Sequence, residues 1–367
     1  MIFIIYANAG FGHKKAAEAI EDGFKKKSSS VETKLIDILE FTPKWFSYTY
    51  SGSYRFLATK MPWLWGAGFH VCDFRPLFYL IFFFRKIINR MLLGSFIRYV
   101  EKFNPDTLIF THFLGIHTSA MLVKKKKLSA KIYVSVTDFF AHSFWIDYDV
   151  DGYFVMDKHS KVEMVDKWKI APVKVFPHGI PISSKFSVNH RPKEDVDLST
   201  RPLRILFSSG SFGHGPIIQT LNFLNPFKNK IEVTVVCGNN KKAKETLSKV
   251  SFQFPVKVFG FVDNMDELMS QTDLLIAKPG GITTCEALSQ KVPMIISSYI
   301  PGQEEGNLRI LEEYEVCWRL KKPGDIQRII SEVLTNTEDL ENKRKIMNAL
   351  AKPNATSDII DHITRER

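Results

Sequence analysis

Short, continuously apolar runs alternate with longer segments of helical periodicity along the whole chain. In the first half these runs predict strands at Ile2–Tyr6, Glu32–Ile36, Thr107–Thr111, Lys131–Val136, Gly152–Val155 and Val173–Phe176. In the second half they predict strands at Leu203–Ser208, Glu232–Cys237, Val256–Phe259, Leu274–Ala277, Met294–Ser297 and Val316–Leu320. Apolar strands separated by helices are typical of parallel sheets covered on both faces. The pattern therefore predicts an α/β protein with two doubly wound, Rossmann-like domains.

A polar stretch from Ser183 to Pro202, with two prolines and no apolar periodicity, separates the two halves. Such a composition indicates a linker. The last residues predict one or two amphipathic helices, interrupted at Pro353, which are candidates to pack back on the first domain. We therefore expect an N-terminal domain at 1–185, a linker at 186–202, a C-terminal domain at 203–338 and C-terminal helices at 339–367.

The length of 367 residues, with 45% apolar and 24% charged residues, is that of a globular protein of two domains. The four cysteines, Cys72, Cys237, Cys285 and Cys317, form no CxxC pair, which favours a reducing compartment. The start of the chain has no basic segment before its apolar run, and no stretch approaches the roughly 18 apolar residues that span a bilayer. We interpret the protein as cytosolic.

The net charge of +11 is concentrated in residues 41–100, which hold eight Lys or Arg against one acid, Asp73. The same sixty residues carry 18 of the 47 aromatic side chains. Basic and aromatic side chains in one segment favour a surface that sits among anionic lipid headgroups. The alternative is a helical insertion packed on its own domain. Nucleic acid is less favoured, because the aliphatic and phenylalanine runs exceed what base stacking requires.

The stretch NAGFGHKKAAEAI follows the first expected strand and opens a helix. Gly10 and Gly12 allow a tight turn there. A dinucleotide-binding turn needs a third glycine where this chain has Lys15, so NAD is not expected. His13 stands at the mouth of the turn and can take a proton near pH 7; its alternative role is to cap the helix.

Two further turns, in the second half, offer free backbone N–H groups. LFSSGSFGHG, from Leu206 to Gly215, combines glycines with serine hydroxyls after a strand. KPGGITTCEALSQ, at 278–290, sets two glycines directly before a helix. Both are suited to binding a phosphate. Glu286 follows the two glycines of this second turn and is either an acid favoured by the helix dipole or an acceptor for sugar hydroxyls.

The stretch VTDFFAHSFW follows another strand of the first half. Asp138 and His142 there could act as acid or base, and Trp145 could offer an aromatic platform. The alternative is an N-cap aspartate beside a packed tryptophan. His112 and His117 are five residues apart and suggest no metal site.

Taken together, these stretches resemble the monogalactosyldiacylglycerol synthases and the bacterial processive diacylglycerol glucosyltransferases, relatives of the peptidoglycan N-acetylglucosaminyltransferase that makes lipid II. The matching motifs are AGFGHKKAAEAI, VTDFFAHSFW, HGIPI, SSGSFG, FGFVDNMDELM, KPGGITTCEAL and PGQEEGN. The resemblance implies a GT-B fold, in which two Rossmann-like domains flank a cleft and the second holds a UDP-sugar. One departure is Cys285, where serine is common.

The resemblance also implies site residues. His13 is the favoured base, with Asp138 as its competitor. The residues implied to hold the UDP-sugar are Gly210, Ser211, Gly213, Gly281, Ile282 and Thr283 for the diphosphate, Phe261 and Val262 for the uracil, Glu286 for the ribose, and Gln303, Glu304 and Asn307 for the hexose. The residues expected on the acceptor and membrane side are Gly12, Trp45, Trp63, Trp65, Arg75, Arg85, Lys86, His142 and Trp145.

The expected activity is inverting transfer of galactose or glucose from a UDP-sugar to diacylglycerol at the cytoplasmic membrane face. Such a transfer needs a base on the acceptor hydroxyl and stabilisation of the departing UDP. We expect anionic lipids as partners, no nucleic acid, and neither metal nor other cofactor. The alternatives are an isomerase like UDP-N-acetylglucosamine 2-epimerase and a non-catalytic lipid-binding protein on the same fold.

Overall fold

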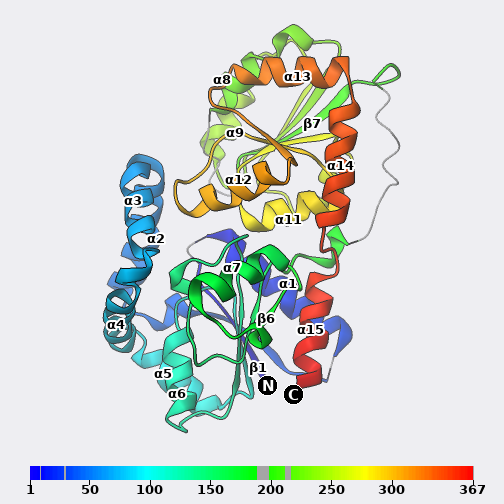
Figure 1. Cartoon of the computed structure of the whole chain (residues 1–367). Coiled ribbons are helices and arrows are strands. Elements are labelled where there is room, and N and C mark those ends of the chain that lie inside the picture. Colours follow the sequence, from blue (N-terminus) through cyan, green and yellow to red (C-terminus); the bar gives the residue numbers. More distant parts are fainter. Residues whose placement is uncertain (9, 29, 188–197, 211–215, 367) are drawn as a thin grey trace. The chain divides into compact units, whose positions relative to one another are not determined.

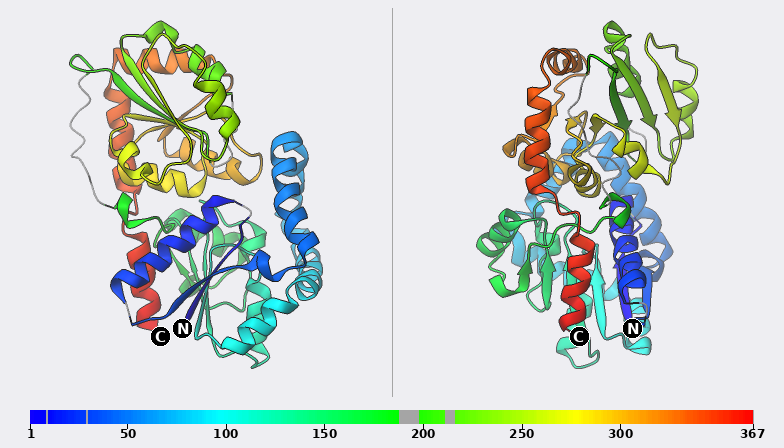
Figure 2. Two further views of the ribbon diagram at one scale, coloured as in Figure 1. Left: turned by 180° about the vertical axis from the view of Figure 1, so that it is seen from behind. Right: turned by 90° about the vertical axis from the view of Figure 1, so that its right-hand side faces the viewer.

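The chain forms two compact α/β units. The computed structural model describes residues 1–366 apart from 9, 29, 188–197 and 211–215. Unit 1 comprises Met1–Ser184, Ile300–Asn307 and Lys352–Arg367, and unit 2 comprises Lys185–Tyr299 and Leu308–Ala351. In each unit the described strands form a parallel sheet with helices on its faces (Figures 1 and 2). The expectation of two doubly wound domains is confirmed.

The sheet of unit 1 has the strand order β2-β1-β3-β4-β5-β6, and all its pairings are parallel. Its strands are β1 (Ile2–Tyr6), β2 (Thr33–Asp37), β3 (Thr107–Phe110), β4 (Lys131–Ser135), β5 (Gly152–Phe154) and β6 (Val175–Phe176). Each of the six predicted strands is present. The last is shorter than predicted because 172–174 form a 3-10 turn. The helices α1 (Phe11–Lys27), α6 (Ile116–Lys124) and α7 (Lys158–Trp168) lie between these strands along the chain.

The basic and aromatic segment folds into four helices of unit 1: α2 (Lys44–Lys60), α3 (Pro62–Cys72), α4 (Arg75–Leu92) and α5 (Gly94–Phe103). Proline stands in the first turn of both α3 and α4, where its missing N–H costs nothing. Helix α5 buries Phe96 and Val100 in the core. Helices α2, α3 and α4 stand along one side of the unit, away from α15 (Figure 1).

The C-terminal helix α15 (Ala355–Glu366) belongs to unit 1 and packs against α1. Ile359, Ile360 and Ile363 are buried with residues of α1 and β1 in one apolar cluster. A Cβ at Gly23 of α1 would lie 2.3 Å from Cδ1 of Ile360, so a larger residue there would displace this side chain. The turn between α14 and α15 packs closely on Gly179, where an added Cβ would lie 2.7 Å from Cβ of Lys352. The φ of Gly179, +102°, also favours glycine.

The sheet of unit 2 has the order β12-β11-β10-β7-β8-β9, again with parallel pairings. Its strands are β7 (Leu203–Ser208), β8 (Ile231–Val236), β9 (Val256–Phe259), β10 (Leu274–Ala277), β11 (Met294–Ile296) and β12 (Cys317–Arg319). The helices that follow them include α8 (Ile217–Asn222), α9 (Lys241–Leu247), α10 (Met265–Ser270), α11 (Gly281–Gln290), α12 (Gln303–Glu313), α13 (Asp325–Thr335) and α14 (Glu338–Leu350). The first residues of α12 lie in unit 1.

Among the helices of the described residues, no single one is both long and apolar enough to cross a bilayer. Helices α3 and α4, which meet at a bend of 95°, reach that length and composition only as a pair.

Candidate active site in unit 1 and glycine loops in unit 2

His13 lies where three neighbouring strands of unit 1 end. It follows β1, and its Nδ1 is 2.7 Å from the carbonyl oxygen of Thr111, just after β3, and 3.1 Å from Oγ1 of Thr137, just after β4. The carbonyl can only accept, so Nδ1 carries the hydrogen and Nε2 is left as an acceptor. Burial lowers the pKa of His13 to about 4, against the opposing effect of the Thr111 hydrogen bond. The imidazole is therefore neutral at pH 7.

His112 stands beside His13, with the two rings edge to face and their centroids 4.7 Å apart. The N–H of Leu114 donates to Nδ1 of His112, and its Nε2 is 3.4 Å from the hydroxyl of Tyr50 in α2. Burial, and then the neighbouring His13, lower the pKa of His112. From its sequence, His112 was weighed only as a metal ligand, so its place beside His13 was not predicted. Its position directly after β3, matching that of Asp138 after β4, was the available signal.

Asp138 follows Thr137 and is therefore adjacent in the chain to a residue that contacts His13. Its Oδ1 is 3.2 Å from Nδ2 of Asn307, and Oδ1 of Asn307 accepts the N–H of Phe139 at 2.9 Å. Burial raises the pKa of Asp138 from 3.8 to about 7, while the Asn307 bond lowers it and the charge of Glu304 raises it further. Asp138 is thus poised to exchange a proton near neutral pH.

The segment Ile300–Asn307, which carries the expected hexose residues, forms the start of α12. Glu304 accepts the N–H of Ile300 at 2.7 Å, and Glu305 accepts that of Gly302 at 3.1 Å. These two bonds fold the segment onto the start of its own helix. The structure thus brings Asn307, and through its helix Gln303 and Glu304, to the side of Asp138.

Three side chains assigned to the acceptor side are turned inward. His142 and Trp145 are each 3% exposed. The guanidinium of Arg85 donates to the carbonyls of Phe144 at 2.7 Å and Ile146 at 2.9 Å. Their contacts are therefore with the fold itself, although Trp145 also lies 6.0 Å from the ring of His13. Gly12 lies in the first turn of α1, next to His13.

Other members of that set lie on the surface of unit 1. Trp45 and Trp63 are 66% and 68% exposed, and Arg75 and Lys86 are also exposed, whereas Trp65 is half-buried. Large apolar side chains surround them on α3 and α4, including Leu64, Phe74, Leu80, Phe83, Phe84 and Met91. A hollow of about 320 Å³ nearby is lined by Lys86, Ile87, Arg90, His117, Met121, Lys124 and Asp149. This surface joins apolar area to cationic groups.

Unit 2 holds the residues expected to bind the nucleotide. Helix α11 starts directly after β10, and no side chain caps its first turn at Gly280. Gly281, Ile282 and Glu286 are buried in this helix, and Thr283 is half-buried. Gly210, which follows β7, has a φ of +69°, and no atom of the described residues lies within 4 Å of a Cβ added there. Ser211 and Gly213 lie outside the described residues.

Phe261 and Val262 follow β9, in the turn before α10. Phe261 is 60% exposed and Val262 is half-buried. Because β7, β9 and β10 are parallel, the segments that follow them leave the sheet at the same edge. Ligands of open α/β sheets bind at this carboxyl edge.

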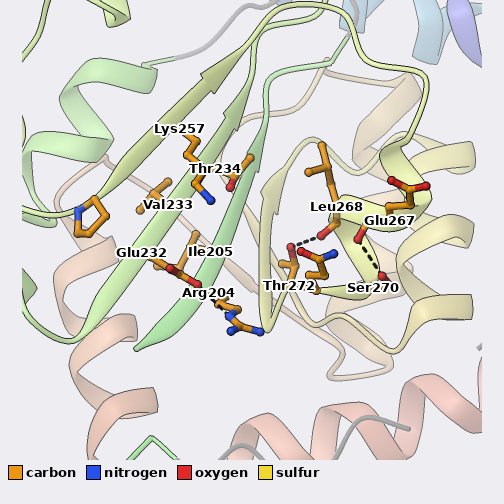
Figure 3. Close-up of a pocket in the computed structure, with 12 residues that line it drawn as sticks. Arg204, Ile205, Glu232, Val233, Thr234, Lys257, Glu267, Leu268, Ser270 and Thr272 are labelled. Atoms are coloured by element: carbon orange, nitrogen blue, oxygen red, sulfur yellow. Dashed lines mark hydrogen bonds and ion pairs between the residues drawn. The ribbon is translucent and has the colours of Figure 1, made fainter. Parts of the chain in front are cut away.

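Unit 2 contains a hollow of about 580 Å³ (Figure 3). Arg204 and Glu232, which form an ion pair of 2.8 Å near the starts of β7 and β8, line it together with Lys257 of β9 and the end of α10. Of the residues implied to hold the UDP-sugar, those that the structure describes do not line this hollow. It is therefore distinct from the candidate nucleotide loops.

Two family models match the chain, one in each half. Residues 13–182 match monogalactosyldiacylglycerol (MGDG) synthase, and residues 204–362 match the glycosyltransferase family 28 C-terminal domain. The chain is 28% identical to monogalactosyldiacylglycerol synthase 2, chloroplastic, of Arabidopsis thaliana, over 100% of this chain and 81% of that protein. It is 27% identical to the processive diacylglycerol beta-glucosyltransferase of Bacillus pumilus, over 100% and 94% of the two chains.

Solved structures share the fold over nearly the full length. MurG of Acinetobacter baumannii matches with a TM-score of 0.61 at 14% identity, covering 99% of each chain. UDP-GlcNAc 2-epimerase of Neisseria meningitidis, bound to UDP-GlcNAc, matches with a TM-score of 0.62 at 13% identity, again covering 99% of each. At such identities the likeness concerns the fold alone. The resemblance stated from the motifs and the GT-B fold class are confirmed.

Proposed function

We propose that the chain, a glycosyltransferase that matches the MGDG synthase and glycosyltransferase family 28 models, transfers galactose or glucose from a UDP-sugar to diacylglycerol. The observation that carries the chemistry is the buried Asp138 carboxyl, held by Asn307 and with a pKa of about 7. The reaction proposed is a single displacement with inversion at the anomeric carbon. It uses the UDP-sugar as co-substrate and no further cofactor.

We propose Asp138 as the base that takes the proton of the diacylglycerol hydroxyl. A base works best when its pKa lies near the working pH. The sequence favoured His13, but a pKa of about 4 makes His13 a weak base at pH 7. Because Thr111 holds the ring by Nδ1, His13 is assigned to shape the acceptor site beside the base and not to take the proton.

The departing UDP gains negative charge, which the loops of unit 2 are proposed to stabilise. The uncapped start of α11 supplies backbone N–H groups and the positive end of a helix dipole. Gly281, Ile282 and Thr283, with Gly210, Ser211 and Gly213, are assigned to the diphosphate. Phe261 and Val262 are assigned to the uracil, and Glu286 to the ribose.

We further propose that the protein binds the membrane peripherally, on its cytoplasmic face, through α2, α3 and α4. Exposed Trp45 and Trp63 have the amphipathic character of interfacial anchors. Lys86 and Arg90 line a hollow beside apolar Ile87, which suits an anionic headgroup. The hydroxyl of diacylglycerol would then reach the site while the lipid chains stay in the bilayer.

The direct test is an assay of UDP-galactose and UDP-glucose, side by side, with diacylglycerol in mixed micelles, followed by chromatography of the lipid product. We expect a glycolipid with one or both donors, and its loss in Asp138→Ala. An isomer of the UDP-sugar, with no glycolipid, would support the epimerase reading instead. UDP-sugar left unchanged while vesicles are bound would support a non-catalytic lipid-binding protein.

The membrane proposal is tested by sedimentation with phosphatidylcholine vesicles, with and without phosphatidylglycerol. Between about 0.1 M and 1 M salt the screening length falls from ~10 Å to ~3 Å, so binding to the anionic vesicles should weaken steeply. The double variant Lys86→Gln and Arg90→Gln should weaken it at low salt, whereas Lys345→Gln on exposed α14 should not. Binding that ignores both salt and these changes would refute the headgroup assignment.

A further inference from the structure

Helix α3 makes close contacts with the segment Ile300–Asn307, and both belong to unit 1. We propose that Phe69 of α3 is a positioning residue for the donor sugar: it holds Gly302, and through it the start of α12, where Gln303 and Glu304 are to meet the hexose. This inference rests on the proposed function, because it assigns to α3 a part in recognising the sugar of the UDP-sugar.

The contact leaves no room for a larger residue in the segment. A Cβ at Gly302 would lie 2.9 Å from three carbon atoms of Phe69, and the φ of Gly302, +79°, is one that glycine adopts without strain. One turn earlier on α3, a Cβ at Gly66 would lie 2.8 Å from Cβ of Pro301. His70, next along α3, is 3.4 Å from the carboxylate of Glu305. Gly66, Phe69 and His70 of α3 therefore all contact the segment.

The other side of Phe69 is fixed by the loop that carries Asp138. The rings of Phe69 and His142 are 3.8 Å apart, and Nε2 of His142 lies 2.9 Å from the carbonyl oxygen of Phe69. Phe140, two residues after Asp138 in the same loop, packs on Gly306. A Cβ added at Gly306 would lie 2.3 Å from Cε1 of the Phe140 ring. Phe69 thus lies between the loop of the proposed base and the segment of the proposed sugar contacts.

The end of α3 is anchored to the same loop by polar contacts. The N–H of Ser143 donates to Asp73 at 2.9 Å, and its hydroxyl donates to the carbonyl of Cys72 at 2.7 Å. Lys167 forms an ion pair with the other oxygen of Asp73. Because these contacts hold the end of α3 on the loop, they fix the position of the Phe69 side chain.

The location of Phe69 predicts a selective effect on binding. The residues assigned to uracil, ribose and diphosphate belong to unit 2, whereas Phe69 and the segment that it contacts belong to unit 1. Loss of its ring should therefore loosen the segment that meets the hexose and leave the hold on UDP unchanged. A defect of general folding would instead weaken both.

The test is calorimetric titration of UDP, UDP-galactose and UDP-glucose, without acceptor, into the full chain. Phe69→Ala should raise the Kd of the UDP-hexose that the wild type binds by about tenfold and leave the Kd of UDP within about twofold. Phe69→Leu, which keeps much of the volume, should recover most of the affinity. Val71→Ala, at an exposed position of the same helix, should change neither Kd.

A double variant isolates the contact. Gly302→Ala should also weaken UDP-hexose binding, through its positive φ and through the clash with the ring. Combining it with Phe69→Ala removes the clash, so the two losses should be less than additive. Equal loss for UDP and UDP-hexose, no loss in Phe69→Ala, or strict additivity would each overturn the inference.

The proposed function fails separately from the inference. A wild type that binds no UDP overturns both. A wild type that binds UDP-hexose and transfers it, with Phe69→Ala unchanged in every titration, overturns only the positioning role.

Discussion

Nδ2 of Asn307 lies 3.2 Å from Oδ1 of Asp138, and the other end of the same amide accepts the N–H of Phe139. One fully buried side chain from the start of α12 thus holds the loop after β4 at two points. The amide stabilises the ionised form of Asp138, against burial, which stabilises the protonated form.

Replacing that amide should move the pH dependence of transfer. Asn307→Asp keeps an oxygen for the N–H of Phe139 but puts a second carboxyl beside Asp138, so the pKa of the base should rise further. We expect the acidic limb of the kcat/KM profile to move upward by more than about one pH unit. Asn348→Asp, on the exposed side of α14, is the matched control and should leave the limb in place. An unshifted limb in Asn307→Asp would mean that another group sets it.

The raised pKa of Asp138 should also cost stability. With a folded pKa of about 7 against an ordinary 3.8, the folded state holds a proton that the unfolded state has lost. The stability this group contributes is complete below about pH 4 and is lost as the pH rises through 7. Asn mimics the protonated form, so Asp138→Asn should gain on the wild type between pH 5 and 8, by roughly 2–3 kcal/mol at ~1.4 kcal/mol per pKa unit.

Urea unfolding of Asp138→Asn and wild type at pH 5, 6.5 and 8 measures this difference. The variant should be inactive in transfer and yet more resistant to urea at pH 8. A stability difference that stays constant with pH would show that the carboxyl is ionised in the folded protein throughout this range.

Glu286 offers a test of the nucleotide site that needs no acceptor. If its carboxylate accepts hydrogen bonds from the ribose, Glu286→Ala should weaken UDP binding more than about tenfold, since a hydrogen bond to a charged group contributes roughly 1.5–3 kcal/mol. Titration with 2′-deoxy-UDP provides the cross-check. The wild type should bind this analogue more weakly than UDP, and the variant should lose that preference. A variant that still prefers UDP would place the ribose elsewhere.

His178 and His362 predict an acid-sensitive attachment of α15. Their rings stand 5.3 Å apart beside Phe176. Burial lowers both pKa values, and the neighbouring His178 lowers that of His362 further. A lowered histidine pKa means stability that is present at neutral pH and is lost as the pH falls through the unfolded value of about 6.5. Hydrogen exchange of the α15 amides should therefore be several-fold faster, relative to the intrinsic rate, at pH 5.5 than at 7.5.

Removing one of the two imidazoles should suppress that dependence. His362→Phe keeps the packing on Phe176 and cannot take a proton. His159→Gln, at an exposed position of α7, serves as the control and should behave as the wild type does. Equal acid sensitivity in His362→Phe would assign the effect to other groups.

The strands were predictable because burial on both faces of a parallel sheet demands an apolar run, which is visible without any knowledge of neighbours. All twelve predicted strands occur. The motifs also identified the turns that carry His13 and Asp138, since each follows a strand. Element ends differ by one or two residues, as at Val173, where a 3-10 turn replaces the predicted start of the strand.

Contacts between distant segments were not predictable. Asp138 and Asn307 are 169 residues apart, and nothing in either motif signals that one carboxyl and one amide meet. Arg85 is a residue for which the sequence suggested a contact that the structure does not show. Its place in a basic and aromatic segment suggested lipid contact, but three-dimensional packing turns it toward backbone carbonyls. Composition locates a surface, whereas the direction of each side chain depends on partners elsewhere in the chain.

The attachment of α15 to unit 1 bears on how the protein is made. Because α15 follows the whole of unit 2 in the sequence, the first 184 residues are synthesised earlier and must wait, with Ile20 and Phe24 of α1 uncovered, until α15 has been made. We expect these 184 residues to need a chaperone until α15 covers the apolar face of α1. A gene fragment that stops at residue 184 should give insoluble protein, which α15 supplied as a fused C-terminal helix should rescue.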